Sequence, residues 1–341
     1  MKNPLLVCPD IGRSNVKLTY GVPGEEPQLS LFPSIAAPVD AINRTCTHGD
    51  DSMDSFVEVD GSLWAAIDAW SDANSLSRDS TRSFPLSGLH DALLKISLIR
   101  SGAAGRDVIL ILGHAVREAG LVPELMRRYA GNLRLNQYQA CNIVDVAAIP
   151  QPMGSIYEAM VQGVLPMKPD EMDAGELICL IDGGSYSVDW IVLNHNYRQI
   201  ESASWSSGIA IRTLIDNLVQ ESEKRDFRIS SATIETALNR GQGDFGSSKA
   251  LRRIAPHVEA HATALANQIF GEMSSRLASC DSDISRVILS GGGAALFGDQ
   301  LAARFRSQGA DIVRLNDSQL ANARGFFAYG SLRYRRMMNV A

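Results

Sequence analysis

Short runs of consecutive apolar residues, each bounded by turn-forming residues, recur along both halves of the chain. Runs without polar alternation are typical of strands that are buried on both faces of a sheet. Longer segments between them carry apolar residues at helical spacing, and this alternation predicts an α/β fold with helices on both faces of parallel or mixed sheets. The strands expected in this way are 5–8, 108–112, 143–149, 177–182, 188–193, 197–204 and 287–289.

Helical spacing predicts helices over 88–100, 116–129, 249–278 and 295–306, and a last helix that begins near Asp317. A further helix is expected to start at the cap residues 206–208 and to run to about Glu223. The segment 25–87 is polar and rich in proline, with weak strand signals at 55–59 and 62–67.

Two short segments follow apolar runs and each contains a glycine turn introduced by an aspartate. The first is DIGRSNVK (residues 10–17) and the second is DGGSYSVD (residues 182–189). Glycine turns with small hydroxyl residues allow backbone N–H groups to approach phosphate oxygens closely, and an aspartate at the strand end can hold the Mg²⁺ that neutralises a phosphate. A single such turn is a common hairpin connection, whereas two of them half a chain apart predict two related domains that bind one nucleotide.

With these motifs the chain resembles the actin superfamily of ATPases, and within it the ParM/StbA family of bacterial plasmid-segregation actins. Four segments occur in the family's order: the first hairpin, the connection 150–159, the second hairpin and the adenosine-type motif 290–294. The segment 321–330 resembles the second connection of that family. The resemblance implies an actin-like (ribonuclease H-like) two-domain ATPase fold with the nucleotide in the interdomain cleft. It implies a domain I of residues 1–165 and 325–341, and a domain II of residues 166–324.

The resemblance also implies a role for each motif residue. Asp10 and Asp182 would hold a hydrated Mg²⁺ through water, and Lys17 would place a charge near the β-phosphate. Both aspartates are thereby candidate catalytic residues of an ATP hydrolase. The residues expected to contact ATP are Gly12, Arg13, Ser14, Asn15, Lys17, Gly183, Gly184, Ser185, Tyr186, Gly291, Gly292 and Gly293.

Gln151 is the third candidate catalytic residue, and it departs from the segregation actins, which carry a glutamate at the aligned position. A glutamine orients an attacking water without accepting a full proton, so hydrolysis is expected to be slow. Arg13 places an unusual, bulky cationic side chain beside the expected phosphate site. Its side chain either binds the γ-phosphate or points toward solvent.

Composition restricts the partners. The formal net charge of −6, with no basic stripe, disfavours direct binding to DNA, so a link to a plasmid is expected to run through a DNA-binding adaptor protein. Five scattered cysteines without a Cys-x-x-Cys pair indicate a reducing, cytoplasmic compartment. No apolar run is long enough to cross a membrane. The tail 333–338 is either an adaptor-docking end or a solvated helix end.

These observations lead to the hypothesis of an ATP-dependent, filament-forming actin that segregates plasmid DNA and assembles head to tail with copies of itself. Phe56, Trp64 and Trp70 are candidate anchors for filament contacts. The alternatives are a small-molecule kinase of the same superfamily and an assembly ATPase for cell structure or pili. A kinase requires a carboxylate base, and Gln151 is not one. The fingerprint-like segment 241–246 follows a helical pattern and is expected to be a surface loop.

Overall fold

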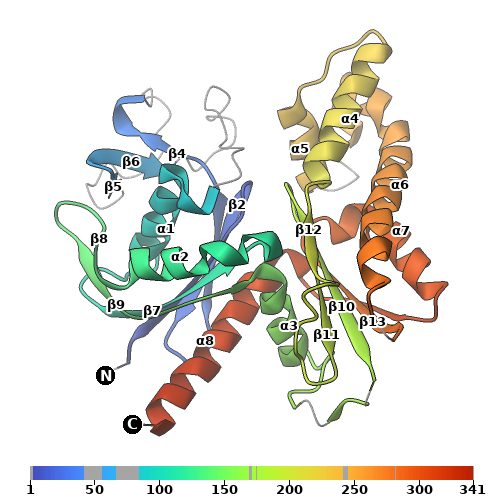
Figure 1. Cartoon of the computed structure of the whole chain (residues 1–341). Helices are drawn as coiled ribbons and strands as arrows, with labels where there is room; N and C mark the ends of the chain where they lie inside the picture. The colour runs from blue at the N-terminus through green and yellow to red at the C-terminus, as the bar shows by residue number, and fades with distance from the viewer. Residues whose placement is uncertain are drawn as a thin grey trace. The chain divides into compact units, whose positions relative to one another are not determined.

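The computed structural model describes residues 3–41, 56–66, 84–168, 171–173, 175–240, 245–280 and 282–340. The chain forms two compact units (Figure 1): unit 1 comprises Met1–Leu165 and Leu320–Ala341, and unit 2 comprises Pro166–Gln319. The boundary at which the chain returns from unit 2 to unit 1, between Gln319 and Leu320, falls shortly before the position 324/325 expected from the sequence. Trp70 and the segment 241–244 lie outside the described residues.

Unit 1 contains a six-stranded mixed sheet and a three-stranded sheet. The large sheet has the order β3-β2-β1-β7-β9-β8, in which β1, β7 and β9 are parallel and the remaining pairs are antiparallel. Its strands are β1 (Leu5–Ile11), β2 (Asn15–Gly21), β3 (Gln28–Pro33), β7 (Asp107–His114), β8 (Gly131–Arg134) and β9 (Ala140–Pro150). The small sheet has the order β4-β6-β5 and consists of β4 (Ala36–Pro38), β5 (Phe56–Val59) and β6 (Ser62–Ala66).

The helices of unit 1 cover both faces of its large sheet, which explains the continuous apolar runs. In β1, Leu5 and Val7 pack in a cluster with α1 on one face, whereas Leu6 and Cys8 pack against α8 on the other. The helical elements are η1 (Val39–Ala41), η5 (Phe84–Leu86), α1 (Gly88–Arg100), η6 (Val116–Leu121), α2 (Val122–Tyr129), α3 (Gln151–Val161) and α8 (Ala321–Val340).

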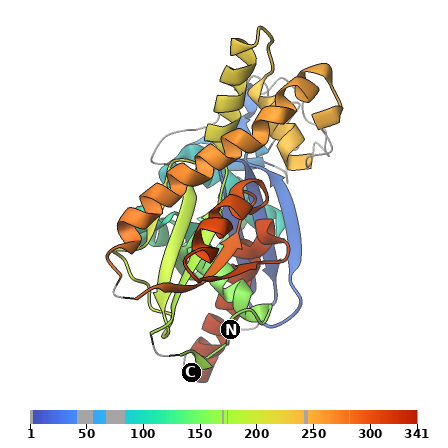
Figure 2. The same ribbon diagram turned by 90° about the vertical axis from the view of Figure 1, so that its right-hand side faces the viewer.

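Unit 2 has a five-stranded sheet of order β12-β11-β10-β13-β14. One face of this sheet packs against α4, α6 and α7 around the buried Trp190, and Figure 2 shows α6 running diagonally across the strands. The elements are β10 (Leu177–Gly183), β11 (Val188–Asn194), β12 (Trp205–Ser207), α4 (Ile211–Lys224), α5 (Ser231–Arg240), α6 (Lys249–Leu277), β13 (Ile284–Ser290), α7 (Ala294–Arg306), β14 (Asp311–Arg314) and η9 (Ser318–Leu320).

The two units repeat one strand plan. In each sheet the hairpin strand (β1 or β10) pairs antiparallel with the next strand, which pairs antiparallel with a third. On its other side the same strand pairs parallel with β7 or β13, which in turn pairs parallel with β9 or β14. This agreement confirms the domain-scale repeat expected from the two hairpin motifs.

Three expectations about local structure are wrong. The segment 197–204 is not a strand: Tyr197 has φ +56, a turn conformation, and the third strand of the meander is β12. The serines of β12 therefore do not cap α4, whose N-cap residue is Ala210. The segment 116–129 is divided into η6 and α2, because Pro123 in the first turn of α2 lacks the N–H that a continuous helix requires.

Candidate functional site

The first hairpin joins β1 to β2 through a tight turn at residues 12–15. The Gly12 N–H donates to the Asn15 carbonyl at 3.1 Å and closes the turn, with Arg13 and Ser14 at its tip. A Cβ on Gly12 would lie 3.0 Å from the Asn15 carbonyl oxygen, so this position accepts only glycine without adjustment. The Gly12 N–H is thus already hydrogen-bonded within the turn. The role of this glycine is to lack a side chain, so that another group can approach the backbone closely.

Asp10, Lys17 and Gln151 form a hydrogen-bonded group at the end of β1. Asp10 and Lys17 face each other across the β1–β2 ladder, and the Lys17 Nζ donates to Asp10 Oδ2 at 3.0 Å. Gln151, the first residue of α3, donates from Nε2 to the other carboxylate oxygen, Oδ1, at 2.9 Å. The buried carboxylate of Asp10 therefore holds both a cation and the candidate water-orienting amide.

Gly113 leaves the space through which the Gln151 side chain reaches Asp10. Gly113 lies next to the end of β7, and a Cβ there would come within 2.9 Å of Gln151 Cγ and 2.6 Å of Phe326 Cζ. The chain must therefore lack a side chain at this position for the amide to reach the carboxylate. Sequence reasoning missed this residue, because a glycine at the end of a buried strand resembles an ordinary strand terminator.

Ser34 supports the first turn from a distant segment and was also missed. Its backbone N–H donates to the Ser14 carbonyl at 2.9 Å, and its hydroxyl donates to the Gly12 carbonyl at 2.5 Å. The side chain is buried, so both bonds form away from water. Ser34 lies in the polar, proline-rich part of the sequence, where no local pattern marks it as a partner of the hairpin.

The second hairpin repeats the geometry of the first. The Gly184 N–H donates to the Ser187 carbonyl at 2.9 Å, which places Ser185 and Tyr186 at the turn tip. Asp182 faces Asp189 across the β10–β11 ladder, as Asp10 faces Lys17 in unit 1. The backbone N–H of Arg212, at the start of α4, donates to the Ser185 carbonyl at 2.8 Å and fixes the turn against this helix.

Asp189 is a buried carboxylate of the second hairpin and is not among the residues expected from the sequence. It accepts a hydrogen bond from the Ser187 hydroxyl at 2.6 Å and another from the Ser206 hydroxyl. These bonds tie β12 to the hairpin and satisfy a charge that would otherwise be costly to bury. The signal was present in the sequence, since Asp189 occupies the position that corresponds to Lys17.

The glycine motif 291–293 packs directly on the second hairpin. A Cβ on Gly291 (φ +77) would lie 2.3 Å from Asp182 Oδ1, and one on Gly293 would lie 3.1 Å from Gly183 Cα. The Gly293 N–H donates to the Gly183 carbonyl at 2.8 Å. Intramolecular packing therefore requires two of the three glycines, whereas Gly292 is exposed and a Cβ there would meet no atom within 4 Å.

Arg13 does not extend into open solvent. Its guanidinium carbon lies 4.9 Å above the centre of the Phe84 ring, in η5. Phe84 is buried and its ring meets His90 of α1 edge to face at 5.4 Å. The tip of the first turn is thus connected to α1 through an aromatic side chain.

Helices α3 and α8 cross at two glycines in unit 1. A Cβ on Gly325 would lie 1.6 Å from the Gly154 carbonyl oxygen, so the two backbones are in direct contact. Next to this crossing the Ser155 hydroxyl donates to Asn322 Oδ1 at 2.7 Å, with both residues buried. The two segments that resemble the family's connections therefore pack against each other.

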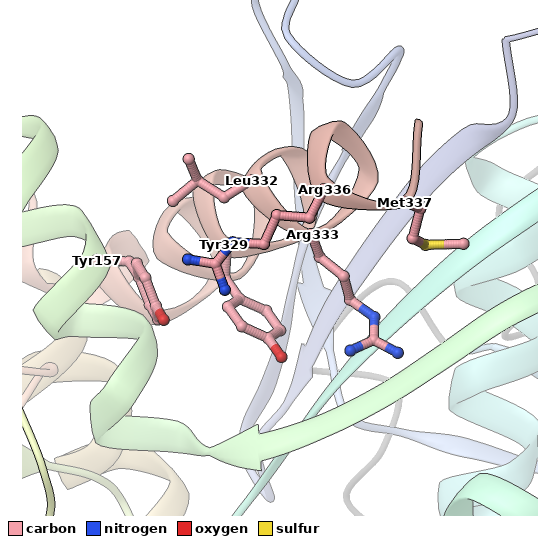
Figure 3. Close-up of a pocket in the computed structure, with 6 residues that line it drawn as sticks. All are labelled: Tyr157, Tyr329, Leu332, Arg333, Arg336 and Met337. Atoms are coloured by element: carbon pink, nitrogen blue, oxygen red, sulfur yellow. The ribbon is translucent and has the colours of Figure 1, made fainter. Parts of the chain in front are cut away.

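A small pocket lies between α3 and α8 (Figure 3). It has a volume of about 210 Å³ and is lined by Tyr157 from α3 and by Tyr329, Leu332, Arg333, Arg336 and Met337 from α8. The two tyrosine rings lie 5.2 Å apart. Arg333, Arg336 and Met337 belong to the tail 333–338. The Arg333 guanidinium donates two hydrogen bonds to the Asp145 carboxylate, at 2.5 and 2.8 Å.

Other candidate chemistry is limited in the described part of the chain. No group of three or more His, Cys, Asp or Glu side chains is arranged there to hold a metal ion. No helix among the described residues is both long and apolar enough to cross a bilayer. The candidate anchors Phe56 and Trp64 are only half-buried rather than exposed.

Comparison with known families agrees with this geometry. A model described as the actin-like protein N-terminal domain matches residues 9–154, and a model of the C-terminal domain of archaeal MreB-like actin homologues matches residues 180–303. The sequence matches none of the curated proteins.

Solved structures share the fold at low identity. The archaeal actin homologue Ta0583 aligns with a TM-score of 0.74 and 19% identity over 96% of this chain and 99% of its own, and its ADP complex aligns with a TM-score of 0.70 at 18% identity over the same shares. A 15-stranded ParM filament from Clostridium botulinum aligns with a TM-score of 0.66 and 15% identity over 97% and 99% of the two chains.

These findings define a two-domain α/β protein with the actin-like fold, as the sequence predicted. The two family matches together span most of the chain, on either side of the connection at α3. The protein belongs to the actin-like ATPase superfamily, and ParM proteins are among its structural neighbours.

Proposed function

We propose that the protein binds ATP with both hairpins, hydrolyses it slowly and assembles into actin-like filaments. The observation that supports this most strongly is that the two turns share the same hydrogen-bonded geometry. Each is closed by a glycine N–H bonded to the carbonyl three residues later, and each follows a buried aspartate. A turn that only connects two strands does not require a second, matching turn. A ligand with several phosphates that is bound from two sides requires one such turn on each side.

The donor chemistry of the two aspartates fits Mg²⁺. Both are buried carboxylates at strand ends, which provide the hard oxygen ligands that this ion prefers. Mg²⁺ usually retains several waters, so it does not require a larger protein cage. When bound, the ion would neutralise phosphate charge. The protein would contribute Lys17 as a cation, the two turns as close backbone surfaces, and the exposed Gly292 as the approach for the adenosine.

Gln151 is the residue that we propose to orient the attacking water. Its amide nitrogen is fixed by Asp10 at 2.9 Å, so the direction of its amide oxygen is set by the same bond. An amide does not remove a proton as a carboxylate does, and hydrolysis is therefore slow enough to time filament disassembly. A kinase reaction is not favoured, because no carboxylate replaces the amide at this position.

Sedimentation together with phosphate release tests the proposal. Purified protein is centrifuged with Mg²⁺ and ATP, with Mg²⁺ and ADP, or without nucleotide. We expect ATP-dependent pelleting that reverses as phosphate appears. Gln151→Ala should still pellet with ATP but should release phosphate at least about tenfold more slowly. A wild-type protein that hydrolyses ATP and stays in the supernatant at all concentrations would contradict filament formation.

We further propose that the filament moves plasmid DNA through an adaptor protein that docks at the pocket between α3 and α8. The pocket combines two aromatic rings with the exposed guanidinium of Arg336, so it fits an acidic segment with an apolar side chain. The net charge of −6 supports an indirect rather than a direct link to DNA. Free thiols at Cys8, Cys141 and Cys179 support a cytoplasmic location.

Plasmid retention provides the test. A plasmid that carries this gene with its flanking DNA is propagated without selection, and plasmid loss is compared between wild type and Arg336→Glu. Charge reversal should increase loss while pelleting of the purified variant stays unchanged. Arg335→Glu, on the neighbouring exposed residue outside the pocket lining, is the matched control. Equal retention in all three strains would refute docking at this pocket.

A further inference from the structure

The outer edge of the six-stranded sheet in unit 1 is formed by β3. Among the described strands, β3 pairs only with β2, and Pro33 lies opposite Asn15 in that ladder. Pro33 has no N–H, so this position is not a hydrogen-bonded pair. Because bonded and non-bonded pairs alternate in an antiparallel ladder, Leu31 and Leu29 belong to the same non-bonded set. Their N–H and C=O groups therefore point away from β2, toward the outer edge.

The side chains of this edge are apolar and exposed. Leu29 is 43% exposed and Leu31 is 52% exposed, and their spacing of two residues places both on one face of the strand. The segment 28–32 contains no charged residue. Exposed edges are usually protected by charges, bulges or prolines, and here the prolines, Pro27 and Pro33, stand only at the two ends. The middle of β3 is therefore able to pair with another strand.

The segment is complementary to a second copy of itself in one antiparallel register. When Ser30 lies opposite Ser30 of the second copy, each Leu29 lies opposite a Leu31, and the leucines of both copies gather on one face. The outward N–H and C=O groups of these leucines are then placed to bond to each other. Each Pro27 lies opposite a Pro33, where pairing ends because neither has an N–H. A shift of the register by two residues would leave a single opposed leucine pair.

The charges at the ends of the segment agree with this register. Arg100 lies over the Phe32 ring at 4.2 Å, on the face opposite the leucines. Phe32 lies opposite Gln28 of the second copy, and the exposed Glu26 precedes that residue by two positions. A cation of one copy and an anion of the other therefore come to the same end of the paired segment, and opposite charges so placed favour the encounter.

We propose that β3 is a dimerisation edge, at which two copies of this chain pair antiparallel around Ser30 and join their six-stranded sheets. The contact is isologous, with two-fold symmetry, whereas a head-to-tail filament contact is heterologous. It is therefore separate from the filament contact and does not depend on a nucleotide. A contact between two short strands is small, so the dimer is weak, with a Kd on the order of 10 µM.

Sedimentation velocity without nucleotide tests the proposal, at protein concentrations of about 1–100 µM that bracket this Kd. Wild type should convert from monomer to dimer across this range. Leu31→Lys places a charge within the edge strand and should raise the Kd at least about tenfold. Leu63→Lys is the matched control: Leu63 is 40% exposed on β6, which is paired on both sides, so this variant should dimerise as wild type does.

Disulfide cross-linking tests the register. In the proposed dimer the two copies of residue 30 form a non-hydrogen-bonded pair with Cα atoms about 4.5 Å apart, a distance that a disulfide can span. The two copies of residue 28 lie more than about 13 Å apart, since each is opposite Phe32. Oxidation with diamide should therefore cross-link Ser30→Cys and not Gln28→Cys, with wild type and its five native cysteines as the baseline.

A wild type that remains monomeric over the whole concentration range would overturn the proposal, because the prolines then suffice to block the edge. Dimerisation that Leu31→Lys leaves unchanged would place the contact elsewhere and would also overturn it, as would equal cross-linking of the two cysteine variants. If Leu31→Lys does not fold, the cysteine variants still decide. None of these measurements uses a nucleotide, so a failure of ATP-dependent pelleting leaves this proposal intact, and its own failure leaves the proposed function intact.

Discussion

The crossing of α3 and α8 predicts a large effect from a single methyl group. A Cβ on Gly325 would lie 1.6 Å from the Gly154 carbonyl oxygen, whereas ordinary contacts begin near 3.4 Å. The atoms that this Cβ would meet belong to helix backbone, which cannot rotate away as a side chain does. Gly325→Ala must therefore push the two helices apart at the point where they touch.

The free energy follows from three contributions. Overpacking of a close contact costs about 1–3 kcal/mol. Separation of the helices stretches the buried hydrogen bond from Ser155 to Asn322, which costs about 1–3 kcal/mol if the bond is lost. The better helix propensity of alanine returns about 1 kcal/mol. We therefore expect a net loss of about 3 kcal/mol, or a decrease of about 6–12 °C in the Tm of unit 1.

Scanning calorimetry of wild type, Gly325→Ala and Gly271→Ala measures this effect. Gly271 lies inside α6, and a Cβ there would meet no atom within 4 Å, so this control should be neutral or up to about 1 kcal/mol more stable. If Gly325→Ala unfolds at or above the wild-type temperature, the helices do not touch at this crossing and the reasoning is refuted.

Three further predictions concern single positions. Gly113→Ala should lower kcat for ATP without a matching change in KM, because its methyl displaces Gln151; a kcat equal to that of the wild type would contradict this. Gly292→Ala should keep the wild-type Tm and weaken ATP binding, whereas Gly291→Ala, at φ +77 and against buried atoms, should lower the Tm; equal Tm values would contradict this. Burial lowers the pKa of His90 from 6.5 to about 3. The free energy of unfolding should therefore fall as the pH decreases from 6.5 toward 3, by up to about 1.4 kcal/mol per pH unit. In urea titrations, His90→Gln should flatten this pH dependence, and parallel pH profiles of wild type and variant would contradict it.

Sequence patterns predicted the buried strands well because their physical cause is local. The strands β1, β7 and β10 are covered on both faces or deeply buried, so nearly every position is apolar. The two hairpins were equally evident, since the Asp-x-Gly and Asp-Gly-Gly segments follow such strands directly. By contrast, β3 was missed: it lies at the edge of its sheet, and its exposed Leu29 and Leu31 do not form an apolar run.

The supporting contacts of the site were not predictable, because they join segments that are distant in the sequence. Ser34, which follows β3, bonds to the turn at Gly12, which precedes β2. Ser206 bonds to Asp189 and does not cap a helix. The hydroxyl of a serine has no sequence signature that distinguishes these roles. The same applies to Gly113, whose importance depends on where Gln151 and Phe326 meet in three dimensions.

The central claim is that one nucleotide is bound by both hairpins. Amide hydrogen exchange with and without Mg²⁺–AMPPNP tests it most directly. We predict that exchange slows at both turns, 12–15 and 184–187, at the same nucleotide concentration and to a similar extent. Protection at only one turn, or at neither while AMPPNP is bound elsewhere, would contradict the claim.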